Sequence, residues 1–380
     1  MKKIIAWVLF AVAVIVILAV NAWRTEKEAV VPAVKKPVVK IGAIFPMSGN
    51  WELMGSQMRD GVLMRLQEQK QKPGLFKYEV TMEDDGGEPK RKNMAYLKLV
   101  NTDKCDVILD DAGNLLAPLA ARDKKLFLNL SWDEKAAADS CAFIHCTPAK
   151  PQARMIADVL SRMGIKRVAV MCMIQQGFMA MDREFTAYAP TVGIATQTIK
   201  FNPDEIDFRG HLLKFYDFKP DAYLLLTADP SFEIIIRRIR ELDKQTVITA
   251  VEGFTYLDDI SAYNGYFYVA GNQPTQEFES KFKAEMNRKA LGTAGFSGVT
   301  YDMLDLVIYA YETAGAKLGC KPTTAEAAEV LRNLKDYPGA IGNLTMGPNR
   351  VIQSPAVLKY IENGKATPVT IEELKKKSGK

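Results

Sequence analysis

The stretch that decides the fold covers residues 38–66 and runs from an apolar strand through a polar turn into a helix. It reads Val38-Val39-Lys40-Ile41-Gly42-Ala43-Ile44-Phe45, then Pro46-Met47-Ser48-Gly49-Asn50, with a helix predicted from near Glu52. A buried strand followed by such a turn and a helix places backbone N–H groups at the carboxyl edge of a sheet. Small anions commonly bind at such an edge. The stretch therefore predicts an α/β fold with a ligand site.

Ahead of this stretch lies an apolar segment that indicates export. Lys2 and Lys3 precede an uninterrupted apolar run over residues 4–20, and Asn21-Ala22-Trp23-Arg24 follows. A positive start, an apolar run and a small residue are typical of a secretory signal peptide, here over residues 1–24. The run is also close to the length of a membrane span, so an uncleaved anchor over residues 4–22 is the alternative. We interpret residues 25–37 as a linker.

Composition places the chain among globular proteins of about two domains. Of its 380 residues, 48% are hydrophobic and 25% are charged, and 50 Lys+Arg against 45 Asp+Glu give a net charge of +5. The basic residues are scattered except for Lys375-Lys376-Lys377 at the C-terminus. This distribution argues against nucleic acid as a partner.

Short apolar runs alternate with helical periods from residue 40 onward. The runs cover residues 40–45, 78–82, 106–109, 126–130, 167–171, 222–227 and 247–251. Such alternation predicts parallel sheets built from βαβ units, and a break near residues 147–151 predicts that a second sheet begins there. The last third is mainly helical over residues 277–289 and 297–316. It ends in an alternating strand pattern at 356–361 that Glu362-Asn363-Gly364 closes.

Residue types for catalysis or metal binding are scarce. His145 and His211 are the only histidines and lack metal-ligand spacing, so we expect no metal site. No phosphate-binding loop, dinucleotide fingerprint or nucleophile elbow occurs. We therefore expect a protein that is not an enzyme and carries no cofactor. What remains is a set of strand-end loops that would face a shared cleft, at residues 47–53, 110–114, 131–134, 174–178, 228–231 and 252–256.

Several short motifs occur in a fixed order over nearly the whole chain. They are residues 40–49, Arg59-Asp60-Gly61, Asp84-Asp85, Gln175-Gln176-Gly177-Phe178, Phe296-Ser297-Gly298-Val299-Thr300-Tyr301-Asp302 and residues 342–350. In this order the chain resembles the periplasmic solute-binding proteins of branched-chain amino acid ABC transporters, the type I (leucine/isoleucine/valine-binding) family. The resemblance implies two Rossmann-like lobes with parallel central sheets, joined by three crossovers. We assign residues 38–149 and 275–343 to lobe 1, and residues 150–274 and 344–380 to lobe 2.

The resemblance also implies roles for individual residues. An acid at the start of a second-lobe loop would pair with a ligand ammonium group, and Glu252 holds that position. Hydroxyls and backbone N–H groups of two first-lobe loops would hold a ligand carboxylate. In this chain only Ser131 offers a hydroxyl there, whereas Asp110, Asp111, Trp132 and Asp133 depart from the pattern.

This departure leaves two interpretations open. An acidic pocket with a tryptophan face suits a cationic or amide-bearing ligand. Alternatively, Asp110 and Asp133 cap helices and point away from the cleft. The predicted ligand-binding residues, with Phe178 as an aromatic wall, are Ser48, Trp51, Asn114, Ser131, Trp132, Asp133, Phe178, Ala228 and Glu252.

Together these observations predict an extracytoplasmic, periplasmic binding protein. It would close two lobes on a small polar ligand, such as an amino acid, an amide or a related amine, and deliver it to an ABC transporter permease. On an uncleaved anchor, the same fold would be a membrane-anchored ligand-sensing domain, with membrane contact through the N-terminal segment. An enzyme on a similar α/β scaffold is the least favoured alternative.

Overall fold

The computed structural model describes residues 14–16, 36–137, 140–257, 259–271, 273–286 and 294–378, with residues 294 and 295 described by backbone alone. The chain divides into two compact units, Met1–Pro37 and Val38–Lys380. In the first unit residues 14–16 are helical, and the rest of the predicted signal or anchor segment lies outside the described residues. Within the described residues, no helix has the length and hydropathy that crossing a bilayer requires.

A five-stranded, fully parallel sheet forms the centre of the first lobe. Its strand order is β2-β1-β3-β4-β5. The strands are β1 (Val38–Phe45), β2 (Lys77–Asp84), β3 (Val107–Asp110), β4 (Leu126–Asn129) and β5 (Ala142–Ile144). Phe45 pairs with Asp84 and Ile44 with Asp110, so the ends of three strands meet at one edge. The predicted strand and turn at residues 38–50 are thereby placed at the carboxyl edge of a sheet.

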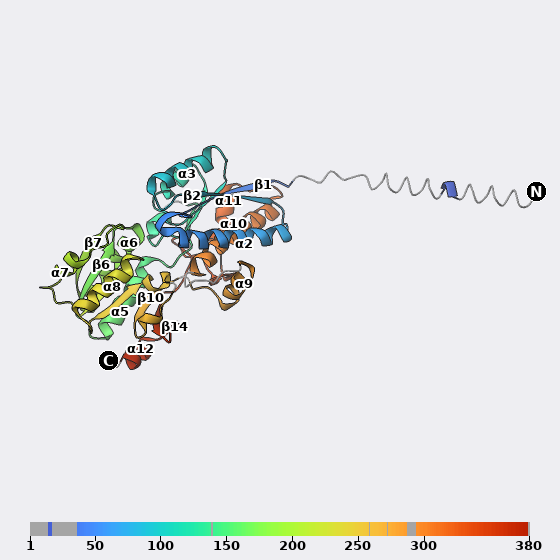
Figure 1. The fold of residues 1–380 in the computed structure, drawn as a ribbon. Helices are drawn as coiled ribbons and strands as arrows, with labels where there is room; N and C mark the ends of the chain where they lie inside the picture. The colour runs from blue at the N-terminus through green and yellow to red at the C-terminus, as the bar shows by residue number, and fades with distance from the viewer. Residues whose placement is uncertain are drawn as a thin grey trace, which may run out of the picture. The chain divides into compact units, whose positions relative to one another are not determined.

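The helices of the first lobe come from both ends of the unit. They are α2 (Glu52–Gln71), α3 (Pro89–Asn101), α4 (Ala117–Arg122), α9 (Gln276–Met286), α10 (Ala294–Leu318) and α11 (Thr324–Arg332). Figure 1 shows the orange α10 beside the blue α2. A Cβ at Gly61 would lie 2.1 Å from the carbonyl oxygen of Ser297, so glycine permits this close approach. The Thr300 hydroxyl donates to the Met58 carbonyl oxygen across the same contact, at 2.8 Å.

A seven-stranded sheet forms the centre of the second lobe. In the order β7-β6-β8-β9-β10-β13-β14, the first five strands are parallel, β13 pairs antiparallel with β10, and β14 pairs antiparallel with β13. The strands are β6 (Arg167–Met173), β7 (Ala195–Phe201), β8 (Ala222–Leu226), β9 (Val247–Val251), β10 (Phe267–Ala270), β13 (Val357–Glu362) and β14 (Lys365–Pro368). The helices are α5 (Ala149–Arg162), α6 (Gln176–Tyr188), α7 (Arg209–Leu213), α8 (Ser231–Leu242) and α12 (Ile371–Ser378). The five parallel strands repeat the order of the first sheet, which is a doubly wound arrangement.

The chain passes three times between the hydrophobic clusters of the first lobe, of which the largest is called the first core, and the core of the second lobe. Cys146 belongs to the first core and Ala149 to the second, and the chain returns between Ala270 and Phe278. Val351 forms a parallel bridge to Ile144 of β5 and still belongs to the first core. The chain leaves that core after Ile352 and enters the second-lobe core at Ala356. The expected α/β fold with two parallel-sheet lobes and three crossovers is confirmed, whereas the lobe limits assigned from the sequence stay a prediction.

Short elements complete the connections between the lobes. A two-stranded ribbon, β11 (Tyr337–Gly339) with β12 (Gly342–Leu344), follows α11. The predicted turn after residue 361 joins β13 to β14, with positive φ angles of 53° at Asn363 and 69° at Gly364. Two consecutive residues with positive φ angles are typical of a tight hairpin turn.

Candidate functional site

Two adjoining pockets lie where the carboxyl-end loops of the two sheets meet. The outer pocket has a volume of about 400 Å³, and the inner pocket has a volume of about 60 Å³. Trp51, Met54 and Tyr256 line both, so the inner pocket continues the outer one. Trp51 ends a short 3-10 helix (Gly49–Trp51) of the first lobe, and Tyr256 ends another (Gly253–Tyr256) of the second lobe. The outer pocket is within the size range of ordinary small-molecule sites.

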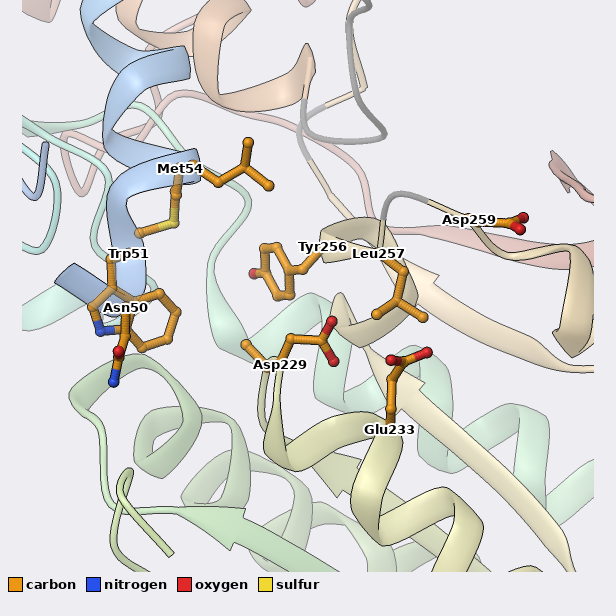
Figure 2. Close-up of a pocket in the computed structure, with 10 residues that line it drawn as sticks. Asn50, Trp51, Met54, Asp229, Glu233, Tyr256, Leu257 and Asp259 are labelled. Atoms are coloured by element: carbon orange, nitrogen blue, oxygen red, sulfur yellow. The ribbon is translucent and has the colours of Figure 1, made fainter. Parts of the chain in front are cut away.

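Acidic and apolar side chains line the outer pocket. Figure 2 shows Asn50, Trp51 and Met54 on the first-lobe side, facing Asp229, Glu233, Tyr256, Leu257 and Asp259 from the second lobe. Ala228 and Leu53 complete the lining. Asp229 and Glu233 are four residues apart at the N-terminal end of α8, and the Tyr263 hydroxyl donates to Glu233 at 2.6 Å.

Aromatic rings dominate the inner pocket. Trp132 of the first lobe meets Phe178 of the second edge-on, with ring centroids 5.5 Å apart. Tyr256 of the second lobe stacks on Phe296 of the first at 5.9 Å. The other lining residues are Trp51, Met54, Met58, Asp111, Ala112, Leu130, Ser131, Gln175, Gln176 and Gly177. Both ring pairs cross from one lobe to the other, so the aromatic residues also connect the lobes.

Five of the nine residues predicted to contact ligand line these pockets. Trp51 lines both pockets, Ser131, Trp132 and Phe178 line the inner one, and Ala228 lines the outer one. The Ser131 hydroxyl is already engaged, because it donates to Asn114 Oδ1 at 3.0 Å and approaches the Asp133 carbonyl oxygen at 3.1 Å. Their role as ligand contacts stays a prediction.

Ser48 and Asn114, also predicted to contact ligand, support the loops instead of lining a pocket. The Ser48 hydroxyl donates to Asp84 Oδ2 at 2.5 Å, and Asn114 accepts from Ser131. Burial acts to raise the pKa of Asp84, but hydrogen bonds from Ser48 and from the N–H groups of Gly86 and Met47 outweigh it and lower that pKa. Both residues therefore fix the positions of strand-end loops of the first lobe.

Asp133 lies outside the lining of both pockets and pairs with Arg183 of α6, Oδ2 to Nη1 at 3.2 Å. Its other carboxylate oxygen accepts the Lys135 N–H at 3.2 Å. Asp110 likewise accepts the Gly113 N–H at 2.7 Å and pairs with Lys92 of α3 at 2.8 Å. Each aspartate accepts a nearby backbone N–H, but the N-cap residue of α4 is Leu116 and carries no side-chain cap, so Asp110 does not cap that helix.

Lys92 is buried among three carboxylates. It pairs with Asp85 at 3.1 Å, with Asp110, and with Asp111, which also lines the inner pocket. Although burial opposes the charge, the three carboxylates raise the Lys92 pKa well above its usual value. Burial raises the pKa of Asp111 to about 7, against the attraction of Lys92. Lys92 therefore neutralises part of the acidic charge behind the inner pocket.

Glu252 is 5% exposed and lies outside the lining of both pockets. It follows β9 with a φ of 63°, which is unusual for a residue with a side chain. Its carboxylate accepts the Gly271 N–H at 2.6 Å, at the start of the second passage between the lobes. Burial raises the Glu252 pKa to about 7, whereas Gly271 and Lys359 favour the charged form.

Sequence reasoning missed several lining residues, including Met54, Asp259 and Phe296. Asp229 and Tyr256 fall inside loops that were predicted to face the cleft, so the topological signal was available for them. Phe296 belongs to a helix, and only the packing of α10 on α2 brings it to the pocket.

A family model described as periplasmic binding protein matches residues 38–365. The chain belongs to the periplasmic binding protein family. The type I family expected from the order of sequence motifs is thereby confirmed. The match covers the first sheet, the second sheet as far as the start of β14, and all three passages between the lobes.

Individual relatives of this periplasmic binding protein are distant in sequence. It is 23% identical over 339 residues to the Leu/Ile/Val-binding protein BraC3 of Rhizobium johnstonii, covering 85% of this chain and 91% of that one. A leucine-binding protein LivK from Thermotoga maritima superposes with a TM-score of 0.76 at 20% identity, over 87% of this chain and 98% of the other. A solute-binding protein from Rhodopseudomonas palustris in complex with 3,4-dihydroxybenzoic acid gives 0.75 at 19% identity, over 87% and 96%. These structures share the fold.

Proposed function

We propose that this chain is an extracytoplasmic solute-binding protein that closes its two lobes on a small polar ligand. The observation that carries the proposal is the pair of pockets between the lobes, lined by strand-end loops of both sheets. A ligand in such a position contacts both lobes at once. It therefore favours the arrangement in which the lobes are together over one in which they are apart.

Contacts across the pockets support closure as the mechanism. Trp132 packs on Phe178, Tyr256 stacks on Phe296, and Asp133 pairs with Arg183, each joining the first lobe to the second. The lobes are linked by only three chain passages, which can act as a hinge. Ligand binding would stabilise this set of contacts, and ligand release would follow their separation.

We propose that the protein delivers its ligand to an ABC permease. The relative from Rhizobium johnstonii is a Leu/Ile/Val-binding protein, and solute-binding proteins of ABC transporters from Rhodopseudomonas palustris have the same fold. Export through residues 1–24 would place the chain outside the cytoplasm, either free in the periplasm or anchored by residues 4–22. Sequencing the N-terminus of the exported protein separates the two: loss of the segment indicates a free binding protein, and retention an anchored one.

A thermal-shift screen of the exported protein tests the binding function. The panel should include amino acids, amides, amines and small carboxylates. A ligand that binds only the folded state adds about 2.7 kcal/mol of stability at one hundred times its Kd, which raises the melting temperature. Each ligand that stabilises the protein should be recovered unchanged after incubation. Conversion of that ligand to a product, or no stabilisation by any class, would contradict the proposal.

A further inference from the structure

All charged side chains among the described residues that line the two pockets are acidic. Four carboxylates line them, those of Asp111, Asp229, Glu233 and Asp259, and the described lining residues include no lysine, arginine or histidine. Lys92 pairs with Asp111 but is itself buried and lines neither pocket. Its positive charge therefore compensates the aspartates that it contacts and is not available to a ligand. A ligand carboxylate in these pockets would face like charges without a cationic partner, which disfavours its binding.

Four backbone N–H groups at the strand-end loops, which could otherwise hold an anion, already have acceptors within the protein. On the first lobe, the N–H groups of Gly113 and Ser131 donate to Asp110 and Asn129. On the second lobe, the Gln175 side chain accepts from the N–H groups of Gly177 and Phe178 at the start of α6. The N-terminal end of α8 carries Asp229 and Glu233, so the protein supplies its own negative charge there. These engaged N–H groups and the acidic end of α8 make the strand-end edge less favourable for an anion than such an edge is in general.

Besides the carboxylates, the faces of aromatic rings in the pockets also favour a cation. Trp51 and Tyr256 line both pockets from opposite lobes, and Figure 2 shows their rings on opposite sides of the outer pocket. The face of an aromatic ring attracts an ammonium group, most strongly for tryptophan, and the attraction grows as the lobes exclude water. Carboxylates with aromatic walls recognise an organic cation through both its charge and its apolar body.

We propose that the ligand is an organic amine cation without a carboxylate group, held between Trp51 and Tyr256 with its ammonium group toward Glu233 and Asp229. This inference rests on the proposed binding function and specifies the ligand class of the same site. The apolar part of the cation would contact Met54 and Leu257. The narrow inner pocket would admit only a small group until the lobes separate.

Isothermal titration calorimetry on the exported protein tests the ligand class. The probes are 2-phenylethylamine and 1,4-diaminobutane as amines, with leucine and benzoate as ligands that carry a carboxylate. We expect at least one amine to bind about 100-fold more tightly than leucine and benzoate. Tighter binding of leucine or benzoate than of both amines would overturn the inference while leaving the binding function intact. If no member of the wider thermal-shift panel binds, the proposed function fails as well.

A matched pair of variants on α8 tests the position of the ammonium group. Glu233→Gln removes a charge from the pocket but keeps an acceptor for the Tyr263 hydroxyl, and it should weaken amine binding about fivefold. Glu241→Gln makes the same change on the same helix outside both pockets and should leave the Kd within about twofold. Equal effects of the two variants would overturn the assignment of Glu233.

Discussion

The carboxylate of Asp133 in the first lobe and the guanidinium of Arg183 in the second lobe form an ion pair, Oδ2 to Nη1 at 3.2 Å. The Asp133 side chain is 10% exposed and that of Arg183 is 47% exposed. Asp133 directly follows Trp132 in the first-lobe loop, and Arg183 and Phe178 both belong to α6, so the ion pair and the Trp132–Phe178 contact join the same two segments. Asp133 thus joins the two lobes, although the sequence had suggested that it contacts the ligand.

Removing this pair should favour separation of the lobes. Because Arg183 is half exposed, we expect Asp133→Asn to cost no more than about 1 kcal/mol of closure, which weakens ligand affinity up to about fivefold. Titration calorimetry with the best ligand of the screen measures this. Glu184→Gln is the control, because Glu184 pairs with Arg183 within the second lobe. Tighter binding of a carboxylate ligand by Asp133→Asn would instead place Asp133 in the site.

Gly177 makes room for the aromatic contact between the lobes. A Cβ at this position would lie 2.6 Å from the Trp132 ring, so Gly177→Ala should hold Trp132 away from α6. We expect weaker ligand binding with little change in the urea midpoint of unfolding, since Trp132 is only partly buried where it packs against the second-lobe core.

Gly210→Ala is the matched control for this variant. Gly210 is also helical, but a Cβ there would meet no atom within 4 Å, so neither affinity nor stability should fall. Unchanged affinity in Gly177→Ala would show that closure does not need the Trp132 contact.

Lys92 should be the most sensitive lysine of α3. Lys92→Met leaves Asp85, Asp110 and Asp111 without their buried partner, and losing one member of a buried ion cluster costs about 3–5 kcal/mol. Lys98→Met on the same helix removes a solvent-exposed pair with Glu83 and should cost far less stability than Lys92→Met. Urea unfolding at pH 7 measures both. Similar losses in the two variants would mean that Lys92 is not a buried counter-ion.

Glu252 should make stability depend on pH. Burial raises its folded-state pKa from 4.5 to about 7, so the folded protein holds the proton more firmly than the unfolded chain. The associated stability is fully present below pH 4.5 and is lost as pH rises through 7, by about 3 kcal/mol in all. Glu252→Gln has no charge to bury and should not show this loss.

Urea unfolding of wild type and Glu252→Gln at pH 5, 6, 7 and 8 checks this expectation. Burial also raises the pKa of Asp111 to about 7, and Asp111 is present in both proteins. The difference in unfolding free energy between the two proteins therefore reports Glu252 alone. Glu279→Gln is the control, because Glu279 is the other carboxylate that acts on Lys359 and it is exposed. A constant stability difference between wild type and Glu252→Gln over this range would show that folding does not raise the pKa of Glu252.

The fold could be predicted from the sequence wherever a strand is buried on both faces. β1, β3, β4, β8 and β9 are mainly apolar, which is what burial in a parallel sheet requires. β7 was missed because it is the edge strand of its sheet, and its half-exposed Thr196, Gln197 and Thr198 give no apolar run. β10 was also missed, although it has the same length as β3 and β4.

The candidate site could be predicted only to the level of its loops. Strand ends mark which loops meet at a sheet edge, and this placed Trp51, Trp132 and Tyr256 in cleft-facing segments. The partner of each charge could not be predicted in the same way. Arg183 lies 50 residues from Asp133, and only the relative position of the lobes brings them together. The acidic character of the loops was therefore visible, but which carboxylates remain in the pocket was not.

The most direct test of the central claim is small-angle X-ray scattering of the exported protein with and without the amine that binds best. If the two lobes close on the ligand, the radius of gyration must fall on saturation, and Gly177→Ala must show a smaller fall at the same occupancy. An unchanged radius of gyration on saturation, with full occupancy shown by calorimetry, would contradict closure of the lobes as the response to ligand.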